Sequence, residues 1–156
     1  MRRQRREADT DALLGLRFPD LDHLAASDTQ RRAIESPLRH LREALDQQQW
    51  DRVIGSAKDL AEAASKVAIA LAGGETSSNE DLPALVKKAL QATTRDPDAD
   101  DLAKRLVSAT QQLAHVRNTA GIGHGRNDQP DVSRRAGRLA AATALAVAEY
   151  MLSANR

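Results

Sequence analysis

Three side chains suited to phosphate chemistry, Arg117, Asn118 and His124, lie in one glycine-rich segment that ends at Gly125. A guanidinium is planar and permanently charged, so it can grip a phosphate. An imidazole with an ordinary pKa near ~6.5 can accept or donate a proton at neutral pH. The segment is therefore the candidate site. A plain helix-to-helix turn, in which the arginine and the histidine have no special relation, would use the same glycines.

The other histidines are weaker candidates for proton transfer. His115 precedes Arg117 by two residues, which is about 200° around a helix, so the two side chains point apart. His23 and His40 have no comparable neighbours in the sequence. We expect His124 to be the histidine of the site.

Four further residues are candidates for binding a substrate. Arg126 directly follows the glycine segment and extends its positive charge. Lys58, Glu62 and Lys66 stand four residues apart, so they share one stripe of a helix and can form ion pairs. The stripe is either a solvated face or a surface beside the site.

Composition excludes several classes of function. The chain has 156 residues, of which 41% are hydrophobic, 29% charged and 2% aromatic, and its net charge is +1. This suits one globular domain, and the scarcity of aromatic residues favours close helix packing. No cysteine is present, and no cluster of histidines or carboxylates accompanies His124, so we expect neither a metal nor a cofactor.

The expected location is the cytoplasm. The first residues are basic, but no apolar stretch of ~7–15 residues follows them as it would in an export signal. No run of ~18 apolar residues could cross a membrane. The absence of cysteine fits a reducing compartment.

Apolar residues recur at helical period throughout, and no segment alternates at period two. We expect an all-α, up-and-down bundle of four to five helices. The predicted helices cover about 37–49 with a shorter piece before it, 53–71, a three-turn helix from Pro83, 98–117 and 132–153. Ser36 is the predicted N-cap of the first, with Pro37 at its first helical position.

Two helices near the site have predicted inward faces. For the fourth helix the face is Leu102, Leu106, Ala109, Leu113 and Val116. For the last helix it comprises Ala136, Leu139, Ala140, Ala144, Leu145, Val147, Ala148 and Met151. So many alanines allow another helix to approach closely, either within the bundle or across a dimer.

Residues 1–26 mix arginine with acidic residues and read as a tail or a docking arm before a bundle over residues 27–156. Arg2, Arg3, Arg5 and Arg6 could contact RNA phosphates, and a solvated terminus is the simpler interpretation.

Three blocks of the sequence occur in an order that resembles a known family. They are Gly55–Glu62 followed by Lys66, Asp81–Val86, and the segment from Arg117 to Gly125, where six residues separate arginine and histidine. Together they resemble the abortive infection C-terminal family of the HEPN superfamily, over about residues 50–154. The resemblance implies a HEPN-like helical bundle.

The resemblance also implies metal-independent RNA cleavage, usually by a homodimer, in phage defence or a toxin–antitoxin system. In such a reaction we would assign proton transfer to His124, phosphate binding and charge stabilisation to Arg117, and orientation of the phosphate or histidine to Asn118. Some relatives carry a tyrosine just after the histidine as a modification site. Gly125 and Arg126 follow here, so that form of control is not expected.

Two other functions remain open. A non-catalytic dimerisation or RNA-binding module would contact phosphates through arginines, since aromatic residues for base stacking are scarce. Those arginines are Arg117, Arg126, Arg134, Arg135 and Arg138. An antitoxin-like protein would instead form a stable complex with a partner from the same defence system.

Overall fold

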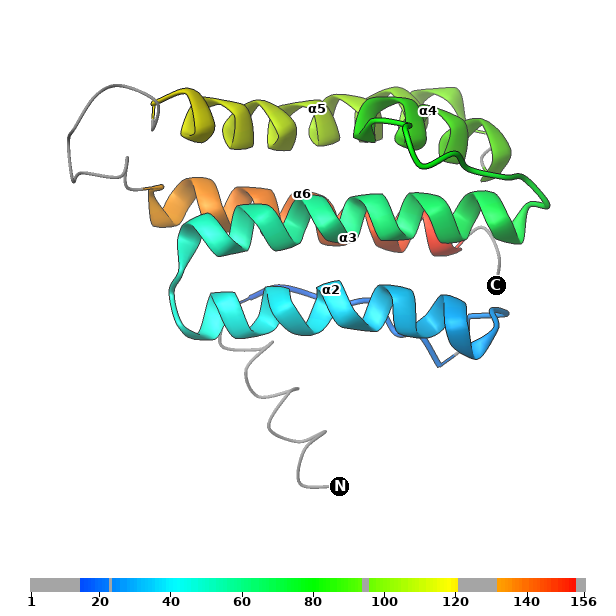
Figure 1. The fold of residues 1–156 in the computed structure, drawn as a ribbon, viewed down its shortest axis with the longest axis horizontal. Helices are drawn as coiled ribbons and strands as arrows, with labels where there is room; N and C mark the ends of the chain where they lie inside the picture. Colours follow the sequence, from blue (N-terminus) through cyan, green and yellow to red (C-terminus); the bar gives the residue numbers. More distant parts are fainter. Residues whose placement is uncertain (1–14, 23, 94–95, 121–131, 154–156) are drawn as a thin grey trace.

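The computed structural model describes residues 15–22, 24–93, 96–120 and 132–153, and within these ranges it is an all-α bundle without a strand, as predicted (Figure 1). The helices are α2 (Asp28–Asp46), α3 (Trp50–Leu71), α4 (Leu82–Thr93), α5 (Pro97–Ala120) and α6 (Arg134–Ser153). None of these helices combines the length and the apolar character needed to cross a membrane.

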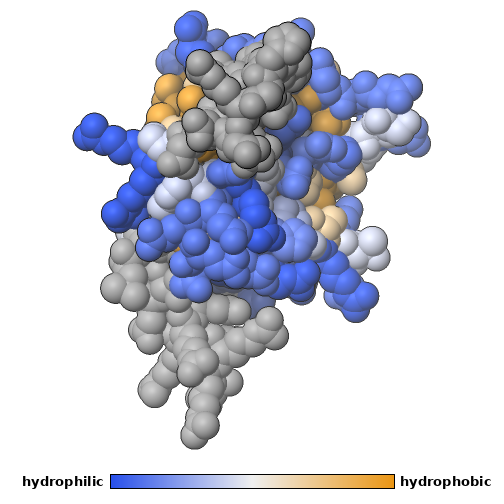
Figure 2. Space-filling model, turned by 60° about the vertical axis from the view of Figure 1, so that its left-hand side comes forward, coloured by the Kyte–Doolittle hydropathy of each residue, from blue (hydrophilic) through white to orange (hydrophobic). Residues whose placement is uncertain are grey.

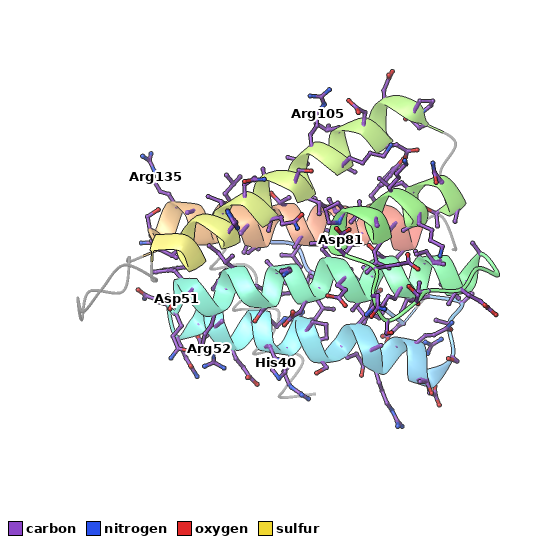
Figure 3. All side chains as sticks on the ribbon, turned by 45° about the horizontal axis from the view of Figure 1, so that its top comes forward. His40, Asp51, Arg52, Asp81, Arg105 and Arg135 are labelled. Atoms are coloured by element: carbon purple, nitrogen blue, oxygen red, sulfur yellow. The ribbon has the colours of Figure 1, made fainter. Side chains whose placement is uncertain are left out.

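Helix α3 is central and packs most extensively against α6 and α2. It runs in the same direction as α6, whereas α2 and α5 run the opposite way (Figure 1). The connection after α3 returns along the bundle, so that α4 starts near Asp81, beside the middle of α3 (Figures 1 and 3). The C-terminal ends of α2 and α5 and the N-terminal ends of α3 and α6 therefore share one end of the bundle, which we call the α5–α6 end.

The first helix corrects one prediction. Ser27, not Ser36, is the N-cap of α2, where its hydroxyl accepts from Gln30 N at 3.2 Å and Gln30 Oε1 accepts from Ser27 N at 2.8 Å. This capping box supplies partners that the start of a helix otherwise lacks. Pro37 lies inside α2, because the apolar face on both sides of it, from Ile34 to Leu38 and beyond, is buried and keeps the helix continuous.

The remaining helix ends follow local signals. Gly73 adopts a φ of +80° just after α3, a left-handed geometry that glycine accepts without steric cost. At the start of α5, Asp96 Oδ1 accepts from the backbone N–H groups of Asp98 and Ala99 at 3.2 and 3.3 Å. Ser133 plays the same part for α6, where its hydroxyl accepts from Ala136 N at 3.2 Å.

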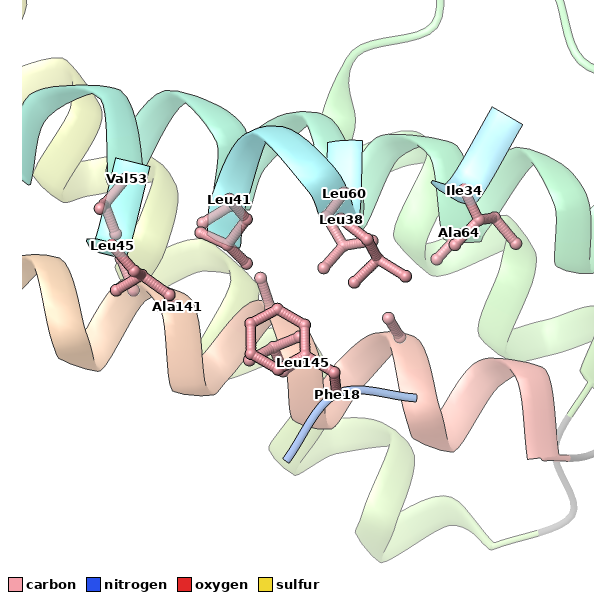
Figure 4. Packing of buried hydrophobic residues seen from close by; sticks show 14 of the residues in the cluster. Phe18, Ile34, Leu38, Leu41, Leu45, Val53, Leu60, Ala64, Ala141 and Leu145 are labelled. Carbon is pink, nitrogen blue, oxygen red and sulfur yellow. The ribbon is translucent and has the colours of Figure 1, made fainter. Parts of the chain in front are cut away.

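The core has two parts that meet along α3 and α6. One lies between α2, α3 and α6, and Figure 4 shows Leu41, Leu45, Val53 and Leu145 within it. The other joins α3 and α6 to α4 and α5, with Leu85 and Leu90 fully buried. Three alanines of α6 that were predicted to face inward are buried inside the bundle. They are Ala140, Ala144 and Ala148.

The buried face of α5 differs from the prediction. Leu102 is 59% exposed and Ala109 is exposed, whereas Ala103, Val107 and Thr110, one residue further along the chain, are buried. Leu106 and Leu113, which were also predicted to face inward, are half-buried against the core. Leu139 of α6, also predicted to face inward, is 58% exposed.

An irregular segment upstream of α2 packs against the bundle, and we call its described residues, 16–22 and 24–26, the strap. Phe18 and Leu24 are buried in the core between α2, α3 and α6, and Figure 4 shows Phe18 beside Leu145. Arg42 of α2 lies over the Phe18 ring, 4.2 Å from its centroid, and Arg31 Nη2 donates to the Leu24 carbonyl at 2.9 Å. The core thus extends upstream of residue 27.

Candidate functional site

The candidate site lies at the α5–α6 end. The backbone of Arg117 and Asn118 forms part of the last turns of α5, and the segment that follows joins α5 to α6. The side chains of Arg117 and Asn118, together with His124 and Arg126, lie outside the described residues. Their arrangement as a site therefore stays a prediction. Of this site, the structure describes only the helix α5, whose last turns include the backbone of Arg117 and Asn118.

Contacts along its length hold α5 in place. Near its start, Tyr150 of α6 donates its hydroxyl to Asp100 Oδ1 at 3.0 Å. Further along, Ala103 and Val107 pack into the second part of the core, and Leu113 lies against the first part, half-buried. Because α5 is one continuous helix, these contacts also fix the position of the backbone at Arg117.

Lys58, Glu62 and Lys66 form a stripe along α3, and they lie at different distances from the α5–α6 end. Lys66 Nζ lies 2.6 Å from Glu62 Oε1, and both side chains are well exposed, so this pair is worth a few tenths of a kcal/mol. Lys58 is half-buried. Because α3 starts at the α5–α6 end, Lys58 is nearest to it, and Lys66 lies about 12 Å further along at 1.5 Å per residue. A role for the stripe in substrate binding remains a prediction.

Arginines gather at the α5–α6 end. Arg134 and Arg135 are exposed in the first turn of α6, Arg138 is half-buried one turn later, and Arg52 is exposed in the first turn of α3. Figure 3 shows Arg135 and Arg52 projecting from this end, and Figure 2, which turns it forward, shows mostly hydrophilic residues there. Arg52 was not among the predicted contacts, because its placement depends on how α3 and α6 pair.

A close helix contact sets the position of these arginines. Trp50, the first residue of α3, packs on Gly137 of α6, where a Cβ would lie 2.9 Å from Trp50 Cε3. Glycine is thus needed for α6 to approach α3 at this point. The tryptophan is the residue that sequence patterns missed, since a single aromatic residue before a helix carries no periodic signal.

Among the described residues outside the candidate site, no group of ionisable side chains forms a second candidate for catalysis or metal binding. His40 and His115 are exposed on α2 and α5. Among the described residues, no three His, Cys, Asp or Glu side chains are grouped so that they could hold a metal ion. The clear pKa shifts involve Glu80, whose pKa the Ser77 N–H and Lys88 lower, and Asp101, whose pKa Arg105 lowers. Neither carboxylate belongs to the helix turns at the α5–α6 end.

A comparison with protein-family models gives the family of the chain, because one model matches most of its length. No curated protein and no solved structure matches the chain. The family model Abi_C, described as a HEPN-like domain, matches residues 32–155, which include α3 to α6 and the segment between α5 and α6. This agrees with the all-α architecture and with the resemblance in the three sequence blocks. The chain belongs to the Abi_C family of HEPN-like, abortive-infection domains.

Proposed function

We propose that the chain is a metal-independent endoribonuclease of a phage-defence or toxin-type system. The observation that carries this proposal is the family match, which covers the whole stretch from Arg117 to His124. Support comes from the arginines of the α5–α6 end, which suit a substrate with a phosphate backbone.

The proposed reaction uses the RNA itself as the nucleophile. The ribose 2′-oxygen bonds to the adjacent phosphorus while the bond from phosphorus to the 5′-oxygen breaks, which leaves a 2′,3′-cyclic phosphate and a 5′-hydroxyl. A base takes the 2′-hydroxyl proton and an acid protonates the 5′-oxygen. His124 serves in proton transfer, Arg117 stabilises the charge on the phosphorane, and Asn118 orients the phosphate or the imidazole.

Cleavage in the presence of a chelator tests this proposal. Wild-type protein and EDTA should convert RNA to fragments with cyclic-phosphate ends. His124→Ala should lower the rate by about 10²–10⁴-fold, the usual worth of general acid–base catalysis. His115→Ala is the matched control, since it removes an exposed histidine of α5 that lies upstream of the motif. Equal rates for wild type and His124→Ala would refute the ribonuclease.

The reaction needs an acid and a base, whereas one chain has one histidine beside Arg117 in the motif. We therefore propose that a second copy completes the site across a two-fold axis. An exposed stripe on α6 suits such a contact, because Leu139 is 58% exposed and Ala142 and Ala146 continue it. Leu139 lies in the second turn of α6, close to the α5–α6 end.

A pair of leucine variants tests the dimer. Leu139→Asp should yield a monomer by light scattering and lose cleavage, because a buried aspartate at the contact costs several kcal/mol. Leu102→Asp is the control, since Leu102 is 59% exposed and lies about 22 Å along α5 from Arg117. A Leu139→Asp variant that stays dimeric would contradict this contact, and a monomeric variant that still cleaves RNA would contradict the shared site.

RNA binding without cleavage is the second candidate function. The exposed arginines of α6 favour it, because phosphate contacts alone give affinity without chemistry. Binding by a wild type that yields no cyclic-phosphate ends would establish this alternative.

A further inference from the structure

Gly55 lies inside α3, although no packing contact requires a glycine there. It belongs to the second turn of the helix and is half-buried. A Cβ built on it would meet no atom of the described residues within 4 Å. Glycine is less favourable than alanine inside a helix. The missing side chain therefore leaves the helix backbone open on a side where the bundle does not use the space.

The open face around Gly55 lies where α4 leaves α3 uncovered. Helix α4 starts near Asp81, beside the middle of α3, and packs on the later half of that helix (Figures 1 and 3). Ala61 belongs to the second part of the core, and Lys58 and Gly55 precede it at steps of three residues. They therefore extend that side of α3 towards its start, beyond α4.

The same face is close to the end of the bundle that carries Arg117. Gly55 is five residues from Trp50, so it lies about 7.5 Å from the start of α3. Helices α3 and α5 are in contact, and Leu113 of α5 packs against the part of the core that contains Val53. The backbone of Arg117 is one turn further along α5, about 6 Å towards the same end. A ligand as long as an RNA chain can therefore reach both places.

Lys58 brings an unpaired positive charge to this face. Its side chain is half-buried, and none of the described hydrogen bonds or ion pairs involves it. Glu62 is four residues from both Lys58 and Lys66, and it binds Lys66 Nζ at 2.6 Å. This choice follows the favoured order in a helix, in which the acidic residue precedes the basic one. Asp51, one turn before Gly55, has a partner of its own in the protein. The Lys58 ammonium is therefore suited to an anion from outside the chain.

We infer that Gly55 and Lys58 form a contact for the RNA backbone, next to the segment that carries the chemistry. The Lys58 ammonium binds a phosphate oxygen, and the missing side chain at Gly55 lets the sugar–phosphate chain come close to the helix. Charge complementarity favours RNA over a second copy of the chain, because the unpaired group of this face is a lysine. The inference rests on the proposed function, since it takes RNA as the ligand.

The salt dependence of RNA binding tests Lys58. All proteins carry His124→Ala, so that a fluorescent single-stranded oligouridine stays intact. Lys58→Gln should reduce the slope of log K against log salt by about 0.7, the value for one phosphate contact in a single strand. Lys87→Gln is the matched control, because it removes an exposed lysine of α4 and should leave the slope unchanged. An unchanged slope for Lys58→Gln, or an equal reduction in the control, overturns the inference.

Filling the space at Gly55 tests the close approach. Gly55→Leu should weaken binding about 10-fold, the worth of one hydrogen bond to a charged group, because the new side chain holds the phosphate away from Lys58. Ala70→Leu is the control, since it adds a similar side chain to an exposed position near the other end of α3. The Tm of Gly55→Leu should not fall, because leucine is better than glycine within a helix. A lower Tm would show that the chain fills this space itself and would overturn the inference.

Two further measurements separate this contact from the proposed chemistry. With His124 intact, Lys58→Gln and Gly55→Leu should raise KM more than they lower kcat, whereas His124→Ala lowers kcat. A wild type that binds RNA with the expected slopes but leaves no cyclic-phosphate ends refutes the ribonuclease and leaves the contact standing. If Gly55→Leu converts a dimer to a monomer, the face belongs to a second copy and the inference is wrong.

Discussion

Replacing Gly137 by alanine tests the contact that places the start of α6. A Cβ at this position would lie 2.9 Å from Trp50 Cε3, 3.3 Å from Trp50 Cβ and 3.5 Å from Trp50 Cδ2. Carbon atoms attract one another best at about 3.5–4.0 Å, so the closest of these contacts is repulsive. The indole cannot simply rotate away, because its own Cβ is among the crowded atoms.

Two opposing effects set the size of the change. Alanine is better than glycine inside a helix by about 0.5–1 kcal/mol. Overpacking a tight contact costs about 1–3 kcal/mol. The second effect is larger, so Gly137→Ala should destabilise the protein by about 1 kcal/mol, or lower Tm by about 2–4 °C for a chain of this size.

Gly55→Ala is the matched control. Gly55 lies within α3, and a Cβ there would meet nothing within 4 Å. The helix-propensity gain should then appear alone, as about 0.5–1 kcal/mol of added stability in urea denaturation. In a Trp50→Leu background, Gly137→Ala should lose most of its cost. If Gly137→Ala and Gly55→Ala stabilise equally, the Trp50 contact does not limit the approach of α6.

Three further variants have expected outcomes. Arg134→Glu puts a negative charge at the positive end of the α6 dipole, so urea denaturation should show about 1 kcal/mol more stability while RNA affinity falls; an unchanged RNA affinity would contradict the proposed binding surface. Glu80→Gln removes a carboxylate whose pKa the Ser77 N–H and Lys88 hold below its ordinary 4.5. The stability that it contributes is present above pH 4.5 and is lost as pH falls through the folded pKa, so wild type and variant should differ in Tm near pH 7 and converge in acid. Pro37→Ala restores a donor inside α2 and should raise stability by about 1–2 kcal/mol; no gain in urea denaturation would show that α2 accommodates the ring without strain.

Helical periodicity was sufficient to predict the bundle and most of its core. Most apolar residues of α3 and α4 are buried, because each of these helices has one dominant apolar stripe. The start of α2 could not be placed in the same way. Ser36-Pro37 is a strong local start signal, but the Ser27–Gln30 capping box lies upstream, and tertiary burial of Ile34 and Leu38 carries the helix through the proline.

The candidate site was located by residue type, whereas its geometry could not follow from the sequence. The backbone of Arg117 belongs to α5, so its position on the helix relative to His115 is set by the helical period. His124 lies beyond the end of that helix, after a spacer without periodicity, and its relation to Arg117 depends on the path of the connection. The arginines of α6 were named from the sequence as phosphate contacts, whereas Arg52 lies at the same end only through the pairing of α3 with α6, which is a tertiary property.

Two of the residues that were wrongly predicted to face inward are leucines, and their positions bear on the proposed dimer. Leu102 and Leu139 were predicted to face inward, since an apolar residue at helical period usually lies in the core. Both are more than half exposed, although alanines and a valine beside them are buried. Single exposed leucines are common on protein surfaces, so these two bear on the proposed dimer only through where they lie. Because Leu139 lies near the α5–α6 end and Leu102 lies far from it, only a contact through Leu139 would bring two copies of the Arg117 segment together. The proposed shared site therefore depends on Leu139, and the Leu139→Asp variant tests it directly.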